Sequence, residues 1–216
     1  MRTISVIARK GGSGKSTVAV QIALAAHLRG RRTLIADADP QHSAGTALEV
    51  RQGLGPEVAL TSGPELYQLQ WEAVRSGVDA MVIDTPAVVG EEILNAVVLA
   101  DFCLLVVRPT YFDLAAAAQT LHIVRPLKKP VMALLNQAPA VRNGVEPAAV
   151  NKALRALAAM RLLVVPATIR ARAIYQQAME RGLSAEETDD AAAAQEVADL
   201  WSYVERLAFP PRVRHA

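Results

Sequence analysis

The 216-residue sequence has one cysteine, few aromatic residues and no long apolar run free of polar groups. The single Cys103 excludes an internal disulfide, and the apolar residues around it predict a buried, unreactive thiol. Asn95 and Asp101 interrupt the most apolar segment, residues 93–107, so the sequence predicts no membrane-spanning helix. The first residues also lack the basic, apolar and small-residue regions of a signal peptide. We therefore expect a cytoplasmic protein.

The composition is that of a folded, helix-rich protein, with 52% hydrophobic and 20% charged residues. Its length fits one domain with one core. Short β-branched runs alternate with longer amphipathic stretches, which is typical of a parallel sheet with crossover helices. The sequence therefore predicts a single α/β domain over residues 1–216, with a mostly parallel, twisted sheet and helices on both faces.

The pattern also predicts where the individual elements lie. We expect strands at residues 3–8, 33–36, 80–83, 102–107, 131–135 and 162–165, and residues 58–60 allow a short edge strand. We expect helices at residues 15–29, 64–76, 91–100, 114–124, 147–160, 173–180 and 191–207. Residues 52–63 are predicted to form an irregular connection.

A glycine-rich segment lies between the first expected strand and the first expected helix. Glycines permit positive φ and turn backbone N–H groups toward phosphate oxygens, and the helix N-terminus adds its positive dipole end. Lys15 would then reach the β- and γ-phosphates, and the Ser16 hydroxyl would ligate Mg²⁺. The segment therefore predicts a phosphate loop, and the alternative is a glycine-rich turn. Its residues are Lys10, Gly11, Gly12, Ser13, Gly14, Lys15, Ser16 and Thr17.

Carboxylates follow the next two strands of the expected sheet. Asp37 and Asp39 come after the second strand, and Asp84 ends the third. Ligands of open parallel sheets bind at the carboxyl ends of the strands. Asp84 at the mouth of a buried strand is a Walker B arrangement that accepts hydrogen bonds from Mg²⁺-bound water. The alternatives are solvated turn acids before Pro40 and an incidental acid after an apolar run.

The phosphate loop departs from the common pattern GxxxxGK[ST], because Arg9 replaces the first glycine and Lys10 follows it. The run KGGxGK[ST] resembles that of the ParA/MinD family of deviant Walker A ATPases. The resemblance implies that Lys10 reaches across a homodimer to the ATP of the partner subunit. A cation facing a triphosphate gains most where a second subunit excludes water. The alternative is a lysine that faces solvent.

The resemblance covers nearly the whole chain and implies roles for further residues. The run DADPQ resembles the first switch region of the family, which implies that Asp39 orients the attacking water and that Asp37 lies near Mg²⁺. Lys10, Lys15 and Asp39 are thus the expected catalytic residues, and Ser16, Asp37 and Asp84 the expected metal ligands. Asn136 is implied to bond adenine, with Pro166 and the residues up to Arg170 near the same base. An ordinary turn amide is the alternative for Asn136.

The formal net charge of +2 hides an uneven distribution of charge. Residues 108–172 hold ten basic residues and two acids, whereas residues 173–216 hold eight acids and four basic residues. The basic segment predicts a surface that binds double-stranded DNA without sequence preference, with Lys152, Arg155, Arg170 and Arg172 as the expected contacts. A solvated basic face is the alternative.

The last expected helix helps to decide whether the ATP-bound protein binds DNA or a membrane. Its apolar face, Val197, Leu200, Trp201, Val204 and Leu207, is opposed by Glu196, Asp199 and Glu205, which an anionic bilayer would repel. We therefore expect this helix to pack on the core, despite Arg212 and Arg214 beyond it. A MinD-like membrane-associated ATPase is the alternative.

Together, the motifs and the resemblance predict a Mg²⁺-dependent ATPase that dimerises with ATP and binds nucleoid DNA. Its length and early first strand are similar to those of small ParA proteins that lack an N-terminal helix-turn-helix. The resemblance implies slow hydrolysis until a ParB-like or cargo-bound adaptor stimulates it. A plasmid, a chromosome or a protein assembly would be a compatible cargo. A metabolic enzyme of the same fold is a rival, whereas a cluster carrier would need paired cysteines.

Overall fold

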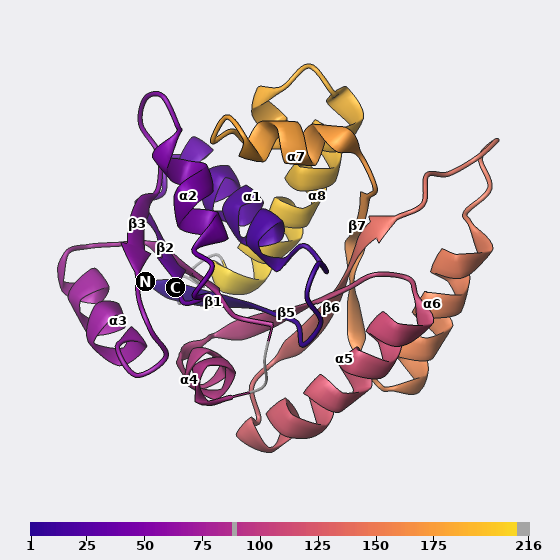
Figure 1. Cartoon of the computed structure of the whole chain (residues 1–216), viewed down its shortest axis with the longest axis horizontal. Coiled ribbons are helices and arrows are strands. Elements are labelled where there is room, and N and C mark those ends of the chain that lie inside the picture. Colours follow the sequence, from indigo (N-terminus) through magenta and orange to yellow (C-terminus); the bar gives the residue numbers. More distant parts are fainter. Residues whose placement is uncertain (88–89, 211–216) are drawn as a thin grey trace, which may run out of the picture.

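The computed structural model describes residues 1–87 and 90–210 and has a seven-stranded sheet at its centre. The strand order is β3-β2-β4-β1-β5-β6-β7, and all neighbouring strands are parallel (Figure 1). This arrangement confirms the predicted fold class. The strands are β1 (Arg2–Ile7), β2 (Thr33–Asp37), β3 (Glu57–Leu60), β4 (Ala80–Asp84), β5 (Phe102–Val107), β6 (Val131–Ala138) and β7 (Leu163–Arg170).

Helices cover both faces of the sheet, so its central strands are apolar on both sides. One face packs against α1, α2, α7 and α8, and the other packs against α3, α4, α5 and α6 (Figure 1). The helices are α1 (Lys15–Leu28), α2 (Ser43–Glu49), α3 (Leu66–Arg75), α4 (Glu91–Leu99), α5 (Tyr111–Val124), α6 (Ala148–Ala159), α7 (Ala173–Met179) and α8 (Ala191–Ala208).

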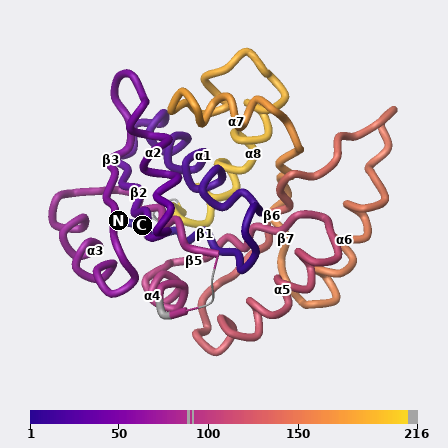
Figure 2. Tube along the Cα trace, in the orientation of Figure 1, coloured from indigo at the N-terminus to yellow at the C-terminus, as the bar shows by residue number. Residues whose placement is uncertain are grey.

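Four elements differ from the sequence prediction by three residues or more, and one of them is α5, which begins at Tyr111 and not at residue 114. The helix α2 was not expected, because seven residues that include Gly45 give too short a pattern. The strands β6 and β7 run on to Ala138 and Arg170, beyond the predicted ends. Pro166 therefore lies inside β7. It is tolerated there because β7 is an edge strand, so the backbone N–H groups on its outer side have no neighbouring strand to bond. The trace in Figure 2 shows the long loop that connects β6 to α6.

The helix α8 packs on the core, as predicted. Val197, Leu200, Trp201 and Val204 are buried in the cluster that α8 shares with α1 and the sheet. Leu207 was predicted to belong to this face, but it is 44% exposed, because Ala208 takes the last buried position of the helix. Arg212 and Arg214 lie outside the described residues.

The thiol of Cys103 is fully buried in β5, as predicted, and burial raises its pKa to about 12. Among residues 1–87 and 90–210, no helix combines the length and the apolar character needed to cross a membrane.

Candidate nucleotide-binding site

A cavity of about 1000 Å³ opens at the carboxyl ends of the strands. Its walls come from the glycine-rich loop after β1, the segment after β2, the end of β6 and the connection from β7 to α7. Parallel sheets place ligand sites at this edge, because loops from neighbouring strands diverge there. The structure therefore brings most of the predicted site residues to one opening.

The glycine-rich loop has the backbone shape of an anion cradle. Gly12 and Gly14 have φ values of 72° and 90°, which side chains rarely allow. A Cβ at Gly14 would also collide with the amide of Asn136. Because no side chain caps the N-terminus of α1, its first N–H groups remain available to an anion.

Lys15 opens α1 and is itself buried at the cavity. Burial lowers the pKa of its ammonium, while Asp84 and Asp39 act in the opposite direction. A cation that is short of solvent gains strongly from a phosphate group. The position and the environment of Lys15 fit the phosphate contact that the sequence predicts.

Asp84 ends β4 as a fully buried carboxylate. Neither of its oxygens has a hydrogen-bond partner among the described residues. Burial raises its pKa to about 7, although the nearby Ser16 hydroxyl partly favours the charged form. A buried, unpartnered carboxylate beside a serine hydroxyl is suited to a hydrated divalent cation, so the residues present fit Mg²⁺.

The two predicted switch carboxylates have different partners. Asp37 is buried, and its oxygens accept hydrogen bonds from the backbone N–H groups of Asp39 (3.1 Å) and Gly45 (2.8 Å). Asp37 therefore shapes the turn into α2, a role that competes with the predicted metal ligation. Asp39 is half-buried, lines the cavity and accepts a hydrogen bond from the backbone of Gln41 (3.0 Å). Asp39 also lies close enough to Lys15 to act on the pKa of that ammonium.

Two side chains at the end of β6 donate hydrogen bonds to the glycine-rich loop. Asn136 donates a hydrogen bond to the carbonyl of Ser13 (2.7 Å), and Gln137 donates one to the carbonyl of Gly12 (3.2 Å). Both residues line the cavity, but the Asn136 amide donor that was predicted to face adenine is used by the loop. Pro166 is exposed within β7 and is not among the residues that line the cavity. The structure does not bring it to the site.

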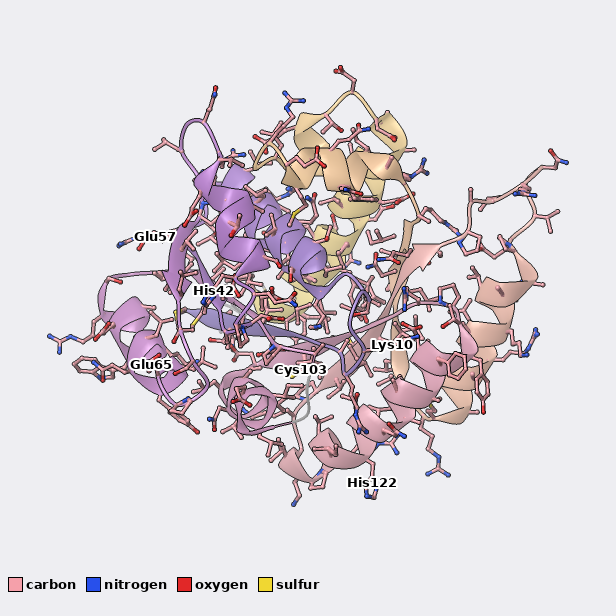
Figure 3. The ribbon with its side chains drawn as sticks, in the orientation of Figure 1. Lys10, His42, Glu57, Glu65, Cys103 and His122 are labelled. Atoms are coloured by element: carbon pink, nitrogen blue, oxygen red, sulfur yellow. The ribbon has the colours of Figure 1, made fainter. Side chains whose placement is uncertain are left out.

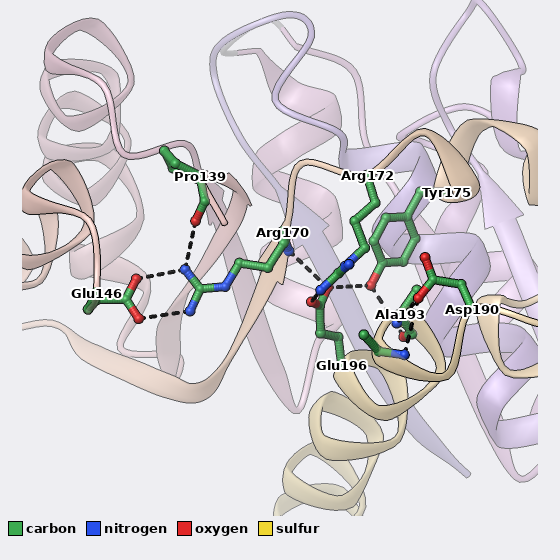
Figure 4. Close-up of polar contacts among 9 residues, drawn as sticks. Pro139, Glu146, Arg170, Arg172, Tyr175, Asp190, Ala193 and Glu196 are labelled. Carbon is green, nitrogen blue, oxygen red and sulfur yellow. Dashed lines mark hydrogen bonds and ion pairs between the residues drawn. The ribbon is translucent and has the colours of Figure 1, made fainter. Parts of the chain in front are cut away.

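Arg170 and Arg172 line the cavity and are both paired with carboxylates (Figure 4). Arg170 donates to Glu146 (2.6 and 2.8 Å) and to the carbonyl of Pro139. Arg172 and the Tyr175 hydroxyl both donate to Glu196 (2.8 Å). Hydrogen bonds to these carboxylates raise the pKa of both guanidinium groups.

These pairings separate the four predicted DNA contacts into two groups. Arg170 and Arg172 belong to the wall of the cavity, while Lys152 and Arg155 are exposed on α6 without a salt bridge to any described residue. The sequence could not reveal this division, because Glu146 and Glu196 each lie 24 residues away in the chain from the arginine they pair with.

Lys10 turns away from the cavity that its neighbours in the loop form. Its ammonium pairs with Asp113 (3.1 Å) and lies 5.5 Å from the centroid of the Phe112 ring. Figure 3 shows Lys10 at the loop, beside α5. The lysine is therefore neither a ligand of its own cavity nor a freely solvated side chain.

The comparison with protein families agrees with these observations. A family model described as the CobQ/CobB/MinD/ParA nucleotide binding domain matches residues 4–185. The chain belongs to this family. The match confirms the resemblance that the KGGxGK[ST] loop indicated.

Individual members of the family are similar over most of the chain. Maintenance of carboxysome distribution protein A from Gloeobacter kilaueensis is 34% identical over 194 residues, which are 85% of this chain and 83% of the relative. Apo McdA from Cyanothece has the same fold, with a TM-score of 0.80 and 16% identity over 94% of this chain and 99% of that one. MinD from Aquifex aeolicus, solved with MinC, gives a TM-score of 0.77 and 18% identity over 94% and 95% of the chains.

Proposed function

We propose that this ParA/MinD family member is a Mg²⁺-dependent ATPase that closes into a homodimer around ATP and positions a cargo. The observation that carries the proposal is the pair of lysines in one loop. Lys15 is buried at the cavity of its own subunit, whereas Lys10 points out of that cavity toward α5. A second subunit would give Lys10 a triphosphate to contact and would exclude water from that contact.

Each residue of the site has a distinct task in this proposal. The loop N–H groups and Lys15 bind and orient the phosphates, and Lys10 of the partner subunit adds positive charge. Ser16 and Asp84 would hold Mg²⁺, which neutralises charge on the transferring phosphoryl group when it is bound. Asp39 orients the attacking water, while Asp37 fixes the backbone that carries Asp39.

The proposed cargo role rests on the relative that is 34% identical and is named for carboxysome distribution. Positioning also needs a surface along which the dimer is retained, and we propose non-specific DNA for this chain. Six exposed cations lie on α6, just before or after it in the chain, or on the turn between α5 and β6: Lys152, Arg155, Arg142, Arg161, Arg125 and Lys128. Arg170 and Arg172, which were predicted to contact DNA, would instead form part of the wall around the nucleotide.

The test is co-sedimentation of the protein with duplex DNA in ATP, in ADP and without nucleotide, at low and moderate salt. We expect retention only with ATP, and salt should weaken it because phosphate contacts release counterions. Lys152→Glu with Arg155→Glu should remove retention. The matched control is Arg181→Glu with Arg206→Glu, which changes the same charge on the α7 and α8 side, where both residues are exposed.

Two outcomes would contradict the proposed DNA surface. Retention that survives Lys152→Glu with Arg155→Glu would refute the assignment to α6. Absence of retention in every nucleotide state, combined with ATP-dependent binding to anionic liposomes, would favour a membrane instead. The bulky apolar residues of α8, apart from Leu207, pack on the core, which favours DNA over a membrane as far as this helix is concerned.

A further inference from the structure

The sheet has an open edge at β3, on the side of the molecule away from β7 (Figure 1). Thr61 donates its backbone N–H to the carbonyl of Asp37 in β2, so the alternation of the strand turns the N–H and C=O groups of Val58 and Leu60 outward. The strand contains no proline or lysine, the residues that often protect an edge. These outward groups therefore have no partner strand in the described part of the chain.

Exposed apolar side chains are concentrated next to this edge. Residues 50–74 hold seven of the large ones, more than any other segment of that length among the described residues: Val50, Leu54, Val58, Leu60, Tyr67, Trp71 and Val74. Tyr67, Trp71 and Val74 recur at helical spacing and form one apolar stripe on α3. The helix packs close to β3, because Leu66 and Ala59 belong to one apolar cluster. An apolar stripe beside an open edge indicates an interaction surface.

The charges on α3 favour a second copy of this chain as the partner. Glu65 precedes the helix and Arg75 ends it, and Figure 3 shows Glu65 on this side of the molecule. Arg75 lies over the ring of Trp71 (4.5 Å), and neither Arg75 nor Glu65 has a salt bridge to a described residue. A helix with opposite charges at its two ends complements a second copy that runs antiparallel to it.

We propose that two copies of this chain associate through β3 and α3 across a two-fold axis. An axis perpendicular to the sheet pairs the two β3 strands antiparallel and keeps both α3 helices on one face, so the apolar stripes meet. No residue of β3 or α3 lines the nucleotide cavity, so this contact needs no ATP. Where the ATP-dependent dimer of the proposed function also forms, two different two-fold contacts on one chain join dimers into longer assemblies.

The size of the surface sets the strength of the contact. It consists of a strand of four residues and a helix of ten. Such a contact falls below the ~1,200 Å² that stable interfaces bury, so it is weak and transient. We expect a dissociation constant on the order of 100 µM. The association is therefore scarce at low micromolar concentrations and becomes populated where the protein is concentrated.

Trp71 provides a direct measurement of this contact. The chain has two tryptophans, of which Trp71 is 55% exposed and Trp201 is fully buried. Association through α3 shields Trp71, so acrylamide should quench the fluorescence less as nucleotide-free protein is raised from about 5 µM to about 500 µM, on either side of the expected dissociation constant. Sedimentation velocity on the same samples should show the mass rising toward that of a dimer.

Three variants locate the contact by sedimentation. Trp71→Glu places two like charges at the centre of the apolar stripe and should weaken association at least about tenfold. Leu60→Pro removes an outward N–H of β3 but leaves the hydrogen bonds to β2, so it should weaken association as well. The matched control is Leu163→Glu, which puts the same charge on an exposed residue of the opposite edge strand and should change nothing.

The outcomes are independent of the proposed function, because nucleotide is absent throughout. Wild-type protein that stays monomeric at about 500 µM would refute the contact. Association that persists in Trp71→Glu, that Leu163→Glu removes equally, or that leaves Trp71 as accessible to acrylamide as before would show that this edge is not the interface. If Leu60→Pro does not fold, Trp71→Glu and its control decide alone.

Discussion

Replacing Asp84 should have opposite effects on ATP hydrolysis and on the stability of the nucleotide-free chain. Its carboxylate is fully buried without a hydrogen-bond partner among the described residues, and burial raises its pKa from 3.8 to about 7. The nucleotide-free chain therefore has to hold a charge in a poorly solvated position above pH 7. We expect Asp84→Asn to lose Mg²⁺-dependent hydrolysis and at the same time to stabilise the nucleotide-free chain.

The sign and the size follow from proton linkage. Because the folded pKa of Asp84 lies above the unfolded value, the folded chain binds more protons between pH 4 and pH 7. Its stability therefore falls as the pH rises through that window, and the full penalty remains above pH 7. The whole shift corresponds to about 4 kcal/mol. After allowance for relaxation and water entry, we expect the gain from Asp84→Asn to be about 1–3 kcal/mol larger at pH 8 than at pH 5.

The assay is chemical unfolding at pH 5 and pH 8 without metal or nucleotide. Comparing the variant with wild type at each pH cancels the other titrating groups. The control is Asp79→Asn, which removes an exposed carboxylate just before the same strand. An Asp84→Asn gain that is the same at both pH values, or a loss at pH 8, would show that the buried charge does not destabilise the free chain.

Three other substitutions test separate parts of the structure. Asn136→Ala removes the donor to the Ser13 carbonyl, so nucleotide affinity in titration calorimetry should fall about tenfold, whereas unchanged affinity would show that the loop needs no support. Trp201→Ala empties a fully buried site, so the free energy of unfolding should fall by about 3–5 kcal/mol. Arg51→Ala removes two hydrogen bonds to the Glu187 carboxylate, which keeps the Ser184 N–H as a donor, and should cost about 1–3 kcal/mol; a loss below about 0.5 kcal/mol would show that this ion pair contributes no more than an exposed one.

The fold and the shape of the glycine-rich loop could be predicted because their causes are local in sequence. Apolar strands, amphipathic helices and the loop from Lys10 to Thr17 each occupy a continuous segment. The position of Asp84 followed from a general rule on the edge of parallel sheets. By contrast, α2 has only seven residues, and β7 continues through Pro166 because it is an edge strand. Neither fact is visible in a local pattern.

The partners of charged residues could not be predicted for a related reason. A count of basic residues treats Arg170 and Arg172 like Lys152, although their carboxylate partners tie them to the wall of the cavity. Likewise, 103 residues separate Lys10 from Asp113 in the chain. Such pairs form only when the sheet order brings distant loops together, so charge counts indicate a basic segment but not a basic surface.

The central claim is that ATP brings two subunits together, with Lys10 of each subunit at the nucleotide of the other. Light scattering of the Asp39→Ala variant tests this claim most directly. Loss of the carboxylate that we propose orients the attacking water should preserve the ATP state, so the measured mass should double with Mg²⁺ and ATP and remain that of a monomer with ADP. Adding Lys10→Ala should return the ATP sample to the mass of a monomer. A mass that is the same with ATP and ADP, or a dimer that persists without Lys10, would contradict the claim.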